Sequence, residues 1–208
     1  MIIDNIWIEF VHKLCVFGGK FFTPFFRVMS FFGEKGWRFL FIAFILLLNK
    51  KTRWIGATII LSIFIGFLTA SVLIKPFIMR LRPYETSKLW QDYWEMAGGI
   101  PDTGFSMPSG HTVACASFFI SLLISCKKKY KAKILNIGIV CTIIMILSRT
   151  YLMHHYLTDC IAGVILSIFT SYLAKFIIKF IYKFCKTYED IGIFNFILNF
   201  DLSKRNNK

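Results

Sequence analysis

The stretch from Met107 to Thr112 places a hydroxyl, a glycine and an imidazole directly before a long apolar run. The run predicts a helix, so that Ser109, Gly110 and His111 lie together at its N-terminus. Amide groups at a helix N-terminus bind anions, and an imidazole can pass a proton to or from a reacting oxygen. The stretch therefore indicates an oxyanion site.

A second histidine is paired with an acid. His155 and Asp159 are four residues apart at the start of another apolar run, which puts them on one helical face within hydrogen-bonding reach. An imidazole held by a carboxylate is a usable nucleophile toward phosphorus. His111 has no acid at helical spacing and can instead donate a proton to a leaving oxygen. Neighbouring His154 is interpreted as a rim residue rather than a metal ligand, because adjacent helical side chains point about 100° apart.

Three cations are placed to hold an anion beside these histidines. Lys75 and Arg82 bracket a proline-containing segment, and Arg149 precedes His155 by six residues. A planar guanidinium matches two phosphate oxygens at once, so a phosphate is the expected ligand. Arg80 is interpreted as a contact to lipid headgroups rather than a further phosphate ligand.

These residues lie at the ends of apolar segments long enough to be membrane spans. Hydrophobic residues make up 56% of the 208 positions, which argues against a soluble domain and predicts an all-α, polytopic transmembrane helical bundle. Four of the five predicted spans are residues 37 to 48, 54 to 74, 111 to 126 and 134 to 147. The fifth is a long helix that follows the polar segment of residues 148 to 159 and ends at about residue 184.

We divide the chain into three regions. Residues 1–36 form an interfacial helix or a sixth crossing, residues 37–186 a transmembrane domain, and residues 187–208 a polar tail. The segment from Lys88 to Ala97 alternates aromatic and polar residues, which predicts a short interfacial helix that serves as a surface anchor or a lid.

Basic residues set the predicted orientation. The net charge of +14 is concentrated in loops such as residues 127 to 133, where lysines mark the cytoplasmic side of a membrane protein. The C-terminus is then cytoplasmic, and the three polar clusters around residues 75 to 83, 108 to 111 and 148 to 159 share the outer face. No nucleic-acid motif accompanies the charge, so nucleic acid is not an expected partner, and no oligomeric state is assigned.

The polar clusters form a recognisable three-part pattern. Lys75-x6-Arg82-Pro83, Pro108-Ser109-Gly110-His111 and Ser148-Arg149-x5-His155-x3-Asp159 resemble the signature of the type 2 phosphatidic acid phosphatase (PAP2) superfamily, which includes bacterial lipid phosphatases and vanadium haloperoxidases. The resemblance implies that His155 attacks phosphorus to give a phosphohistidine, that Asp159 orients it and that His111 protonates the leaving group. It also implies that no metal or other cofactor takes part. The implied phosphate ligands are Lys75, Arg82, Ser109, Gly110 and Arg149.

The expected function is an integral-membrane lipid phosphatase of the bacterial cytoplasmic membrane. Family analogy favours undecaprenyl diphosphate as the substrate, with phosphatidylglycerol phosphate or phosphatidic acid as alternatives. A haloperoxidase is disfavoured because its members are large and soluble. An anion or lipid transporter is disfavoured because the sequence shows no internal repeat and its charges lie at span ends.

Overall fold

The structure is a computed structural model that describes residues 2–202, without the side chain of Lys35, and within them it contains helices and no strand. The helices of four residues or more are α1 (Ile2–Gly33), α2 (Trp37–Leu47), α3 (Arg53–Leu68), α4 (Lys75–Ile78), α5 (Lys88–Met96), α6 (Gly110–Ser125), α7 (Lys128–Tyr151), α8 (Leu157–Thr187) and α9 (Gly192–Asn199), together with the π-helical segment η2 (Thr69–Ile74). Two 3-10 turns, η1 (Glu34–Gly36) and η3 (Pro83–Glu85), complete the set. The all-α bundle predicted from the sequence is confirmed.

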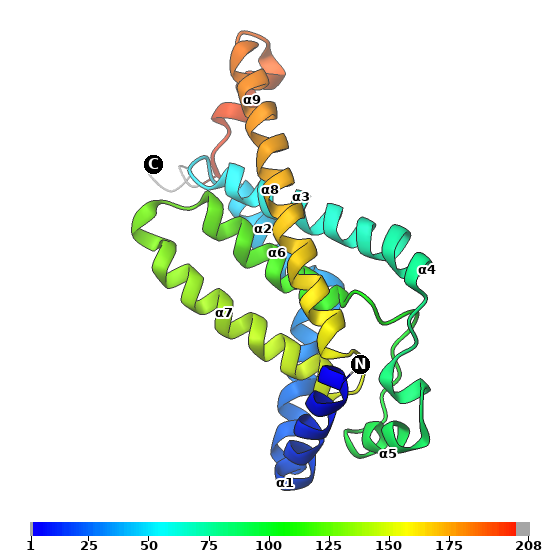
Figure 1. Ribbon diagram of the computed structural model, residues 1–208. Coiled ribbons are helices and arrows are strands. Elements are labelled where there is room, and N and C mark those ends of the chain that lie inside the picture. The colour runs from blue at the N-terminus through cyan, green and yellow to red at the C-terminus, as the bar shows by residue number, and fades with distance from the viewer. Residues whose placement is uncertain (1, 203–208) are drawn as a thin grey trace.

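The centre of the bundle is the mutual packing of α3, α6 and α8, with α2 against α3 and α7 against α6 (Figure 1). Small residues allow the central helices to approach closely. The hydroxyl of Ser171 on α8 lies 2.9 Å from that of Ser62 on α3 and 3.1 Å from that of Ser121 on α6. These buried hydroxyls satisfy one another across three helices, which fixes the register in which α8 presents its first turn.

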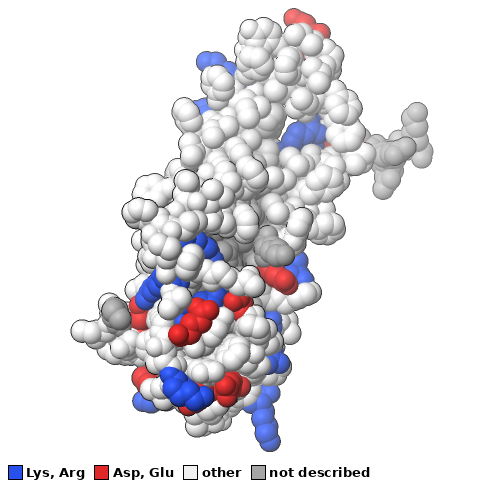
Figure 2. All heavy atoms as spheres, turned by 90° about the vertical axis from the view of Figure 1, so that its right-hand side faces the viewer, with Lys and Arg blue, Asp and Glu red and all other residues white. Residues whose placement is uncertain are grey.

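Apolar helices occupy all five predicted spans. Three stretches are long and apolar enough to cross a membrane, Arg53–Glu85, Lys128–Tyr151 and Leu157–Thr187, and the shorter apolar helices α2 and α6 accompany them. Large hydrophobic side chains such as Phe67 and Phe169 are exposed on their outer faces, as expected for surfaces that contact lipid. Figure 2 shows the charged side chains gathered toward the two ends of the molecule, with a largely uncharged belt between them.

Helix α1 bends sharply at Gly18, and its two arms pack against the end of α7. Trp7 on the first arm donates to the Thr150 hydroxyl at 2.9 Å, and the Phe26 carbonyl on the second arm accepts from Ser148 at 2.7 Å. The helix lies at the lower end of the bundle in Figure 1 and is not among the stretches long and apolar enough to span a membrane. The boundary at residue 36 stays a prediction, although this helix packs closely on the domain that follows it.

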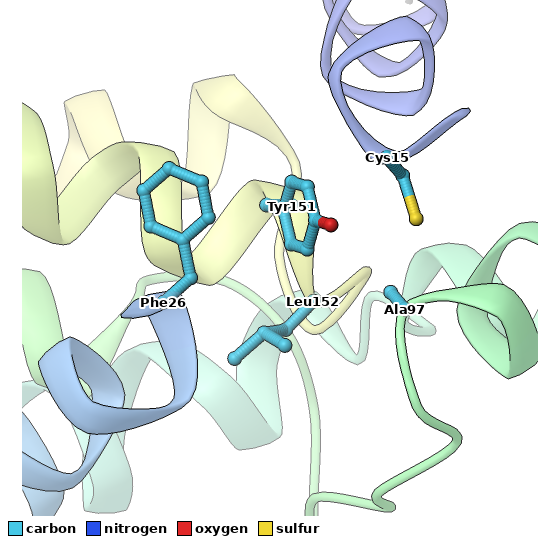
Figure 3. Close-up of a cluster of buried hydrophobic side chains, with 5 residues drawn as sticks. All are labelled: Cys15, Phe26, Ala97, Tyr151 and Leu152. Carbon is cyan, nitrogen blue, oxygen red and sulfur yellow. The ribbon is translucent and has the colours of Figure 1, made fainter. Parts of the chain in front are cut away.

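A buried apolar cluster joins both arms of α1 to the helices beside them. It consists of Cys15 and Phe26 from α1, Ala97 from the end of α5, and Tyr151 and Leu152 from the end of α7 (Figure 3). The predicted interfacial helix is present as α5, and the cluster holds the chain just after it. The end of the bundle that carries the polar clusters is therefore a packed layer.

The lysine-rich loops and the polar clusters lie at different ends of the bundle. The loop between α6 and α7 and the loop between α2 and α3 lie at one end with α9, whereas the N-termini of α6 and α8 and the C-terminus of α7 lie at the other (Figure 1). At the first end, the Arg53 side chain donates to the carbonyls of Ile197 and Phe200, which ties the polar tail to the bundle.

Candidate functional site

The three polar clusters converge at the end of the bundle where α7 ends and α8 begins. Arg82, in the segment before η3, lies 3.5 Å from His155 in the turn between α7 and α8, measured from Nη1 to Nε2. The Ser109 amide, at the start of α6, donates to the Asp159 carbonyl at 3.1 Å. Direct contacts thus link all three clusters, although they are separated by many residues in the chain.

His155 is buried, and its hydrogen bonds leave a lone pair on one ring nitrogen. Its Nδ1 lies 2.7 Å from the Ser106 carbonyl, and a carbonyl only accepts hydrogen bonds, so Nδ1 carries the ring proton and Nε2 a lone pair. Burial, followed by the nearby charges of Arg149 and Arg82, lowers the pKa of His155 well below its ordinary value. The ring is therefore unprotonated at Nε2 at neutral pH, as a nucleophile requires.

Asp159 supports His155 in a way that the spacing alone did not reveal. Its Oδ2 lies 3.7 Å from His155 Nδ1, too long for the expected hydrogen bond, which Ser106 accepts instead. The carboxylate is held by the Tyr156 amide at 2.9 Å and by Arg80 at 2.5 Å. Asp159 consequently acts on the imidazole as a fixed nearby negative charge.

Arg82 and Arg149 converge on one carboxylate, that of Asp102. Arg149 donates to Asp102 and to the Ser30 hydroxyl, while an Arg82 nitrogen lies 3.3 Å from the same Asp102 oxygen. Burial alone would raise the pKa of Asp102, but the two guanidinium groups lower it below its ordinary value. A carboxylate therefore occupies the position between two buried arginines in which a phosphoryl group could be held.

The loop that carries Asp102 is flanked by glycines in left-handed backbone conformations. Gly98, Gly99 and Gly104 have φ values of 110°, 61° and 71°, a region that side chains with a Cβ rarely adopt. The carbonyls of Thr103 and Gly104 accept from Arg82 at 2.6 and 2.9 Å. The same loop thus fixes the Arg82 guanidinium and supplies the acid opposite it.

The remaining predicted anion ligands surround the N-terminus of α6. A Cβ added at Gly110 would meet no atom within 4 Å, so open space lies beside Gly110 on that side of the helix. The Ser109 hydroxyl is buried and accepts from Thr112 at 3.1 Å. Lys75 donates to the Phe105 carbonyl at 2.6 Å. The next residue, Ser106, is the one whose carbonyl accepts from His155.

A cavity of about 270 Å³ is lined by His111, Asp102 and Arg149, with Arg27 and Ser30 from α1, whereas His155 and Arg82 are buried outside its lining. His154 also lines it, and its Nε2 lies 2.7 Å from the Ile100 carbonyl, while burial lowers its pKa to about 3. His154 is thus a buried residue of the cavity wall. His111 lines the same cavity as the Asp102 loop, which suits a proton donor to a group bound there.

Sequence reasoning did not identify three of the residues that shape this site, and it misjudged a fourth. Asp102 lies in an irregular loop, and Ser106 acts through a main-chain carbonyl that no side-chain pattern reports. Ser30 belongs to α1, outside the polar clusters. The assignment of Arg80 to lipid headgroups is wrong, because its side chain is engaged by buried Asp159 and by Asp4.

Comparisons with known proteins give a family and a similar fold. Residues 51–183 match the sequence profile described as the PAP2 superfamily. The fold is similar to that in the "crystal structure of the first transmembrane PAP2 type phosphatidylglycerolphosphate phosphatase from Bacillus subtilis", with a TM-score of 0.63 and 23% sequence identity over 82% of this chain and 84% of that one. No curated protein sequence matches the chain.

Proposed function

The chain belongs to the PAP2 superfamily, and from this premise we propose that it is an integral-membrane lipid phosphatase that works through a phosphohistidine on His155. One observation carries the proposal. The unprotonated Nε2 of buried His155 lies 3.5 Å from a nitrogen of Arg82, and the buried guanidinium groups of Arg82 and Arg149 converge on one carboxylate. This arrangement supplies a nucleophile and a phosphate clamp at the same point.

The reaction takes place in two steps, phosphoryl transfer to His155 and hydrolysis of the phosphohistidine. The lone pair of His155 Nε2 forms a bond to phosphorus while the bond from phosphorus to the leaving oxygen breaks, and His111 donates a proton to that oxygen. A water molecule then attacks phosphorus, the N–P bond breaks, and His111 takes a proton from the water. Lys75, Arg82, Ser109, Gly110 and Arg149 hold the phosphoryl oxygens throughout, so positive charge and helix amides stabilise the transition state.

The preferred substrate in this proposal is undecaprenyl diphosphate, cleaved to undecaprenyl phosphate and inorganic phosphate. The alternative is phosphatidylglycerol phosphate, which is supported by the similarity of the fold to the Bacillus subtilis phosphatidylglycerolphosphate phosphatase, and phosphatidic acid is a third candidate. All three present a terminal phosphate on a lipid that stays in the bilayer, and this matches a site at the end of an apolar bundle.

Phosphate release from these lipids tests the proposal. The purified protein is expected to release phosphate in the presence of EDTA, with kcat/KM for undecaprenyl diphosphate about tenfold or more above that for the two glycerolipids in the same detergent. The highest kcat/KM on phosphatidylglycerol phosphate would instead select the alternative substrate. A requirement for added metal, or no release from any of the three lipids, would contradict the phosphohistidine mechanism.

We place the site on the outer face of the bacterial cytoplasmic membrane, with the tail of residues 187–208 in the cytoplasm. The support is that the lysine-rich segment of residues 127 to 133 lies at the start of α7, whereas the turn between α7 and α8, which carries His155, lies at the other end of α7 (Figure 1). Lysine-rich loops mark the cytoplasmic side of membrane proteins. An outward site would reach substrates exposed on the outer leaflet.

In this scheme the substrate phosphate displaces the Asp102 carboxylate from Arg82 and Arg149. Asp102→Asn keeps the shape but removes the competing charge, so the inhibition constant of vanadate is expected to fall about three- to tenfold. Vanadate is a suitable probe because its trigonal-bipyramidal form resembles the transition state of phosphoryl transfer. Enzyme kinetics at fixed substrate would measure the change.

Asp92→Asn is the matched control for this experiment. Asp92 pairs with Lys88 at 2.8 Å on exposed α5, outside the set of residues that line the site. Its vanadate inhibition constant is expected to equal that of the wild type. Weaker inhibition in Asp102→Asn would mean that Asp102 helps to hold the oxyanion by orienting the arginines.

A further inference from the structure

Arg80 is partly buried and lies at the centre of an ionic chain that reaches from α1 to the nucleophile. Its Nη1 lies 2.5 Å from Asp159 Oδ1, and its Nη2 lies 2.8 Å from Asp4 Oδ2. The side chains of Asp4 and Asp159 are 2% and 0% exposed, so both carboxylates depend on this guanidinium for charge compensation. The Tyr156 ring covers the guanidinium, with its centroid 3.7 Å from Cζ.

The main chain of Arg80 supports the same histidine by a second route. Its carbonyl accepts from the Ser106 amide at 2.8 Å and from the Ser106 hydroxyl at 3.1 Å. The Ser106 carbonyl in turn accepts from His155 Nδ1 at 2.7 Å. Arg80 is therefore connected to both groups that face Nδ1: the carboxylate of Asp159 and the carbonyl of Ser106.

Asp4 anchors this chain to the first turn of α8. Its Oδ1 accepts from the Thr158 amide at 3.0 Å and its Oδ2 from the Thr158 hydroxyl at 2.8 Å, which caps the N-terminus of the helix that carries Asp159. The Thr158 hydroxyl also accepts from Arg80 at 2.7 Å. The first arm of α1, far from the superfamily signature in sequence, is thus in contact with the support of the nucleophile.

We propose that Arg80 and Asp4 are positioning residues for the phosphoryl transfer, which hold Asp159 ionised and fixed beside His155 Nδ1. The inference rests on the proposed function. The imidazole gains positive charge as it attacks phosphorus, and a fixed carboxylate beside Nδ1 stabilises that charge. Without Arg80, Asp159 would be an uncompensated buried charge and would take up a proton or move, so this stabilisation would be lost.

Arg80→Gln is expected to lower kcat about 10- to 100-fold, the size of effect seen when partners that orient a reactive imidazole are removed. KM and the vanadate inhibition constant are expected to change by less than about threefold, since Lys75, Arg82 and Arg149 are untouched. Arg80→Lys retains one positive charge and is expected to recover part of kcat. Steady-state kinetics on the best lipid substrate would give all three quantities.

Arg53→Gln is the control for a merely structural role. Arg53 is a buried arginine, hydrogen-bonded to main-chain carbonyls at the opposite end of the bundle. Both variants are expected to unfold at lower temperature than the wild type, but only Arg80→Gln is expected to lose kcat. An unchanged kcat in folded Arg80→Gln, or a raised KM at unchanged kcat, would overturn the inference; the second result would make Arg80 a phosphate ligand.

Asp4→Asn tests the chain from its other end and keeps the Arg80–Asp159 pair. Its kcat is expected to fall about three- to tenfold, as one charged hydrogen bond that orients Arg80 and Thr158 is lost. Glu9→Gln, on the same arm of α1, makes the same chemical change at an exposed residue that accepts from Tyr93 on α5, and should leave kcat unchanged. Equal kcat values for these two variants would overturn the role of Asp4.

The experiments distinguish a failure of the positioning role from a failure of the proposed phosphatase function. If Arg80→Gln does not fold, Arg80→Lys and Asp4→Asn carry the test, since each leaves the buried carboxylates partly compensated. An active wild type with an equally active Arg80→Lys and Asp4→Asn would overturn the positioning role alone. A wild type that releases no phosphate from any lipid would overturn the phosphatase function, and the positioning role with it.

Discussion

His155→Ala is expected to abolish phosphate release, with kcat lowered by about 10⁴-fold or more, and to leave the protein folded. The size of the effect follows from the mechanism, because removing Nε2 removes the group that forms the bond to phosphorus. The alanine leaves a small cavity and one unpaired carbonyl at Ser106, a modest cost to stability. Phosphate release and thermal unfolding in detergent would be measured side by side.

His12→Ala is the matched control for His155→Ala. His12 lies on α1, and its ring stacks on Tyr93 with centroids 3.4 Å apart, away from the anion ligands. Its kcat is expected to stay within about twofold of the wild type, as for surface changes remote from the chemistry. Wild-type phosphate release by folded His155→Ala would refute His155 as the nucleophile.

His111→Ala is expected to have the second largest effect, and the size should depend on the leaving group. With an alkyl phosphate monoester, whose departing alkoxide is strongly basic, kcat/KM should fall about 10²- to 10⁴-fold because the proton donor is lost. With 4-nitrophenyl phosphate, whose phenolate leaves without a proton, the loss should be less than about tenfold. Initial rates on the two substrates would give the ratio.

The same variant bears on the lipid substrate. In a lipid diphosphate the departing group is a phosphate monoester, which leaves far more easily than an alkoxide. His111→Ala should therefore impair undecaprenyl diphosphate cleavage less than cleavage of phosphatidic acid. Equal losses on the alkyl and aryl substrates would argue that His111 binds the phosphoryl group rather than protonating the leaving oxygen.

The helices and the convergence of the polar clusters could be predicted because periodicity and charge report them directly. Long apolar runs mark α3, α7 and α8, and the lysine-rich loops correctly predicted that residues near 82, 109 and 155 share one end. The four-residue spacing of His155 and Asp159 correctly predicted that they lie close. It could not show that a main-chain carbonyl, that of Ser106, takes the hydrogen bond.

Contacts that depend on tertiary packing left no trace in the sequence pattern. Arg80 is two residues from Arg82, and it looks like a cation at a membrane surface until the fold brings Asp4 from the first turn of the chain against it. Asp102 lies in a glycine-rich loop whose path no periodicity describes. The bend at Gly18, which brings both arms of α1 against α7, is likewise invisible in a run of apolar residues.

The Asp102 carboxylate also affects the release of product from the site. Inorganic phosphate, the product, would bind to the same Arg82 and Arg149 that hold the reactant, and two buried guanidinium groups on their own would keep it. An acid tethered by a loop with glycine bends on both sides is always available to exchange with the departing ion. Because this intramolecular competitor weakens the binding of product phosphate, the turnover rate need not be limited by dissociation of the product.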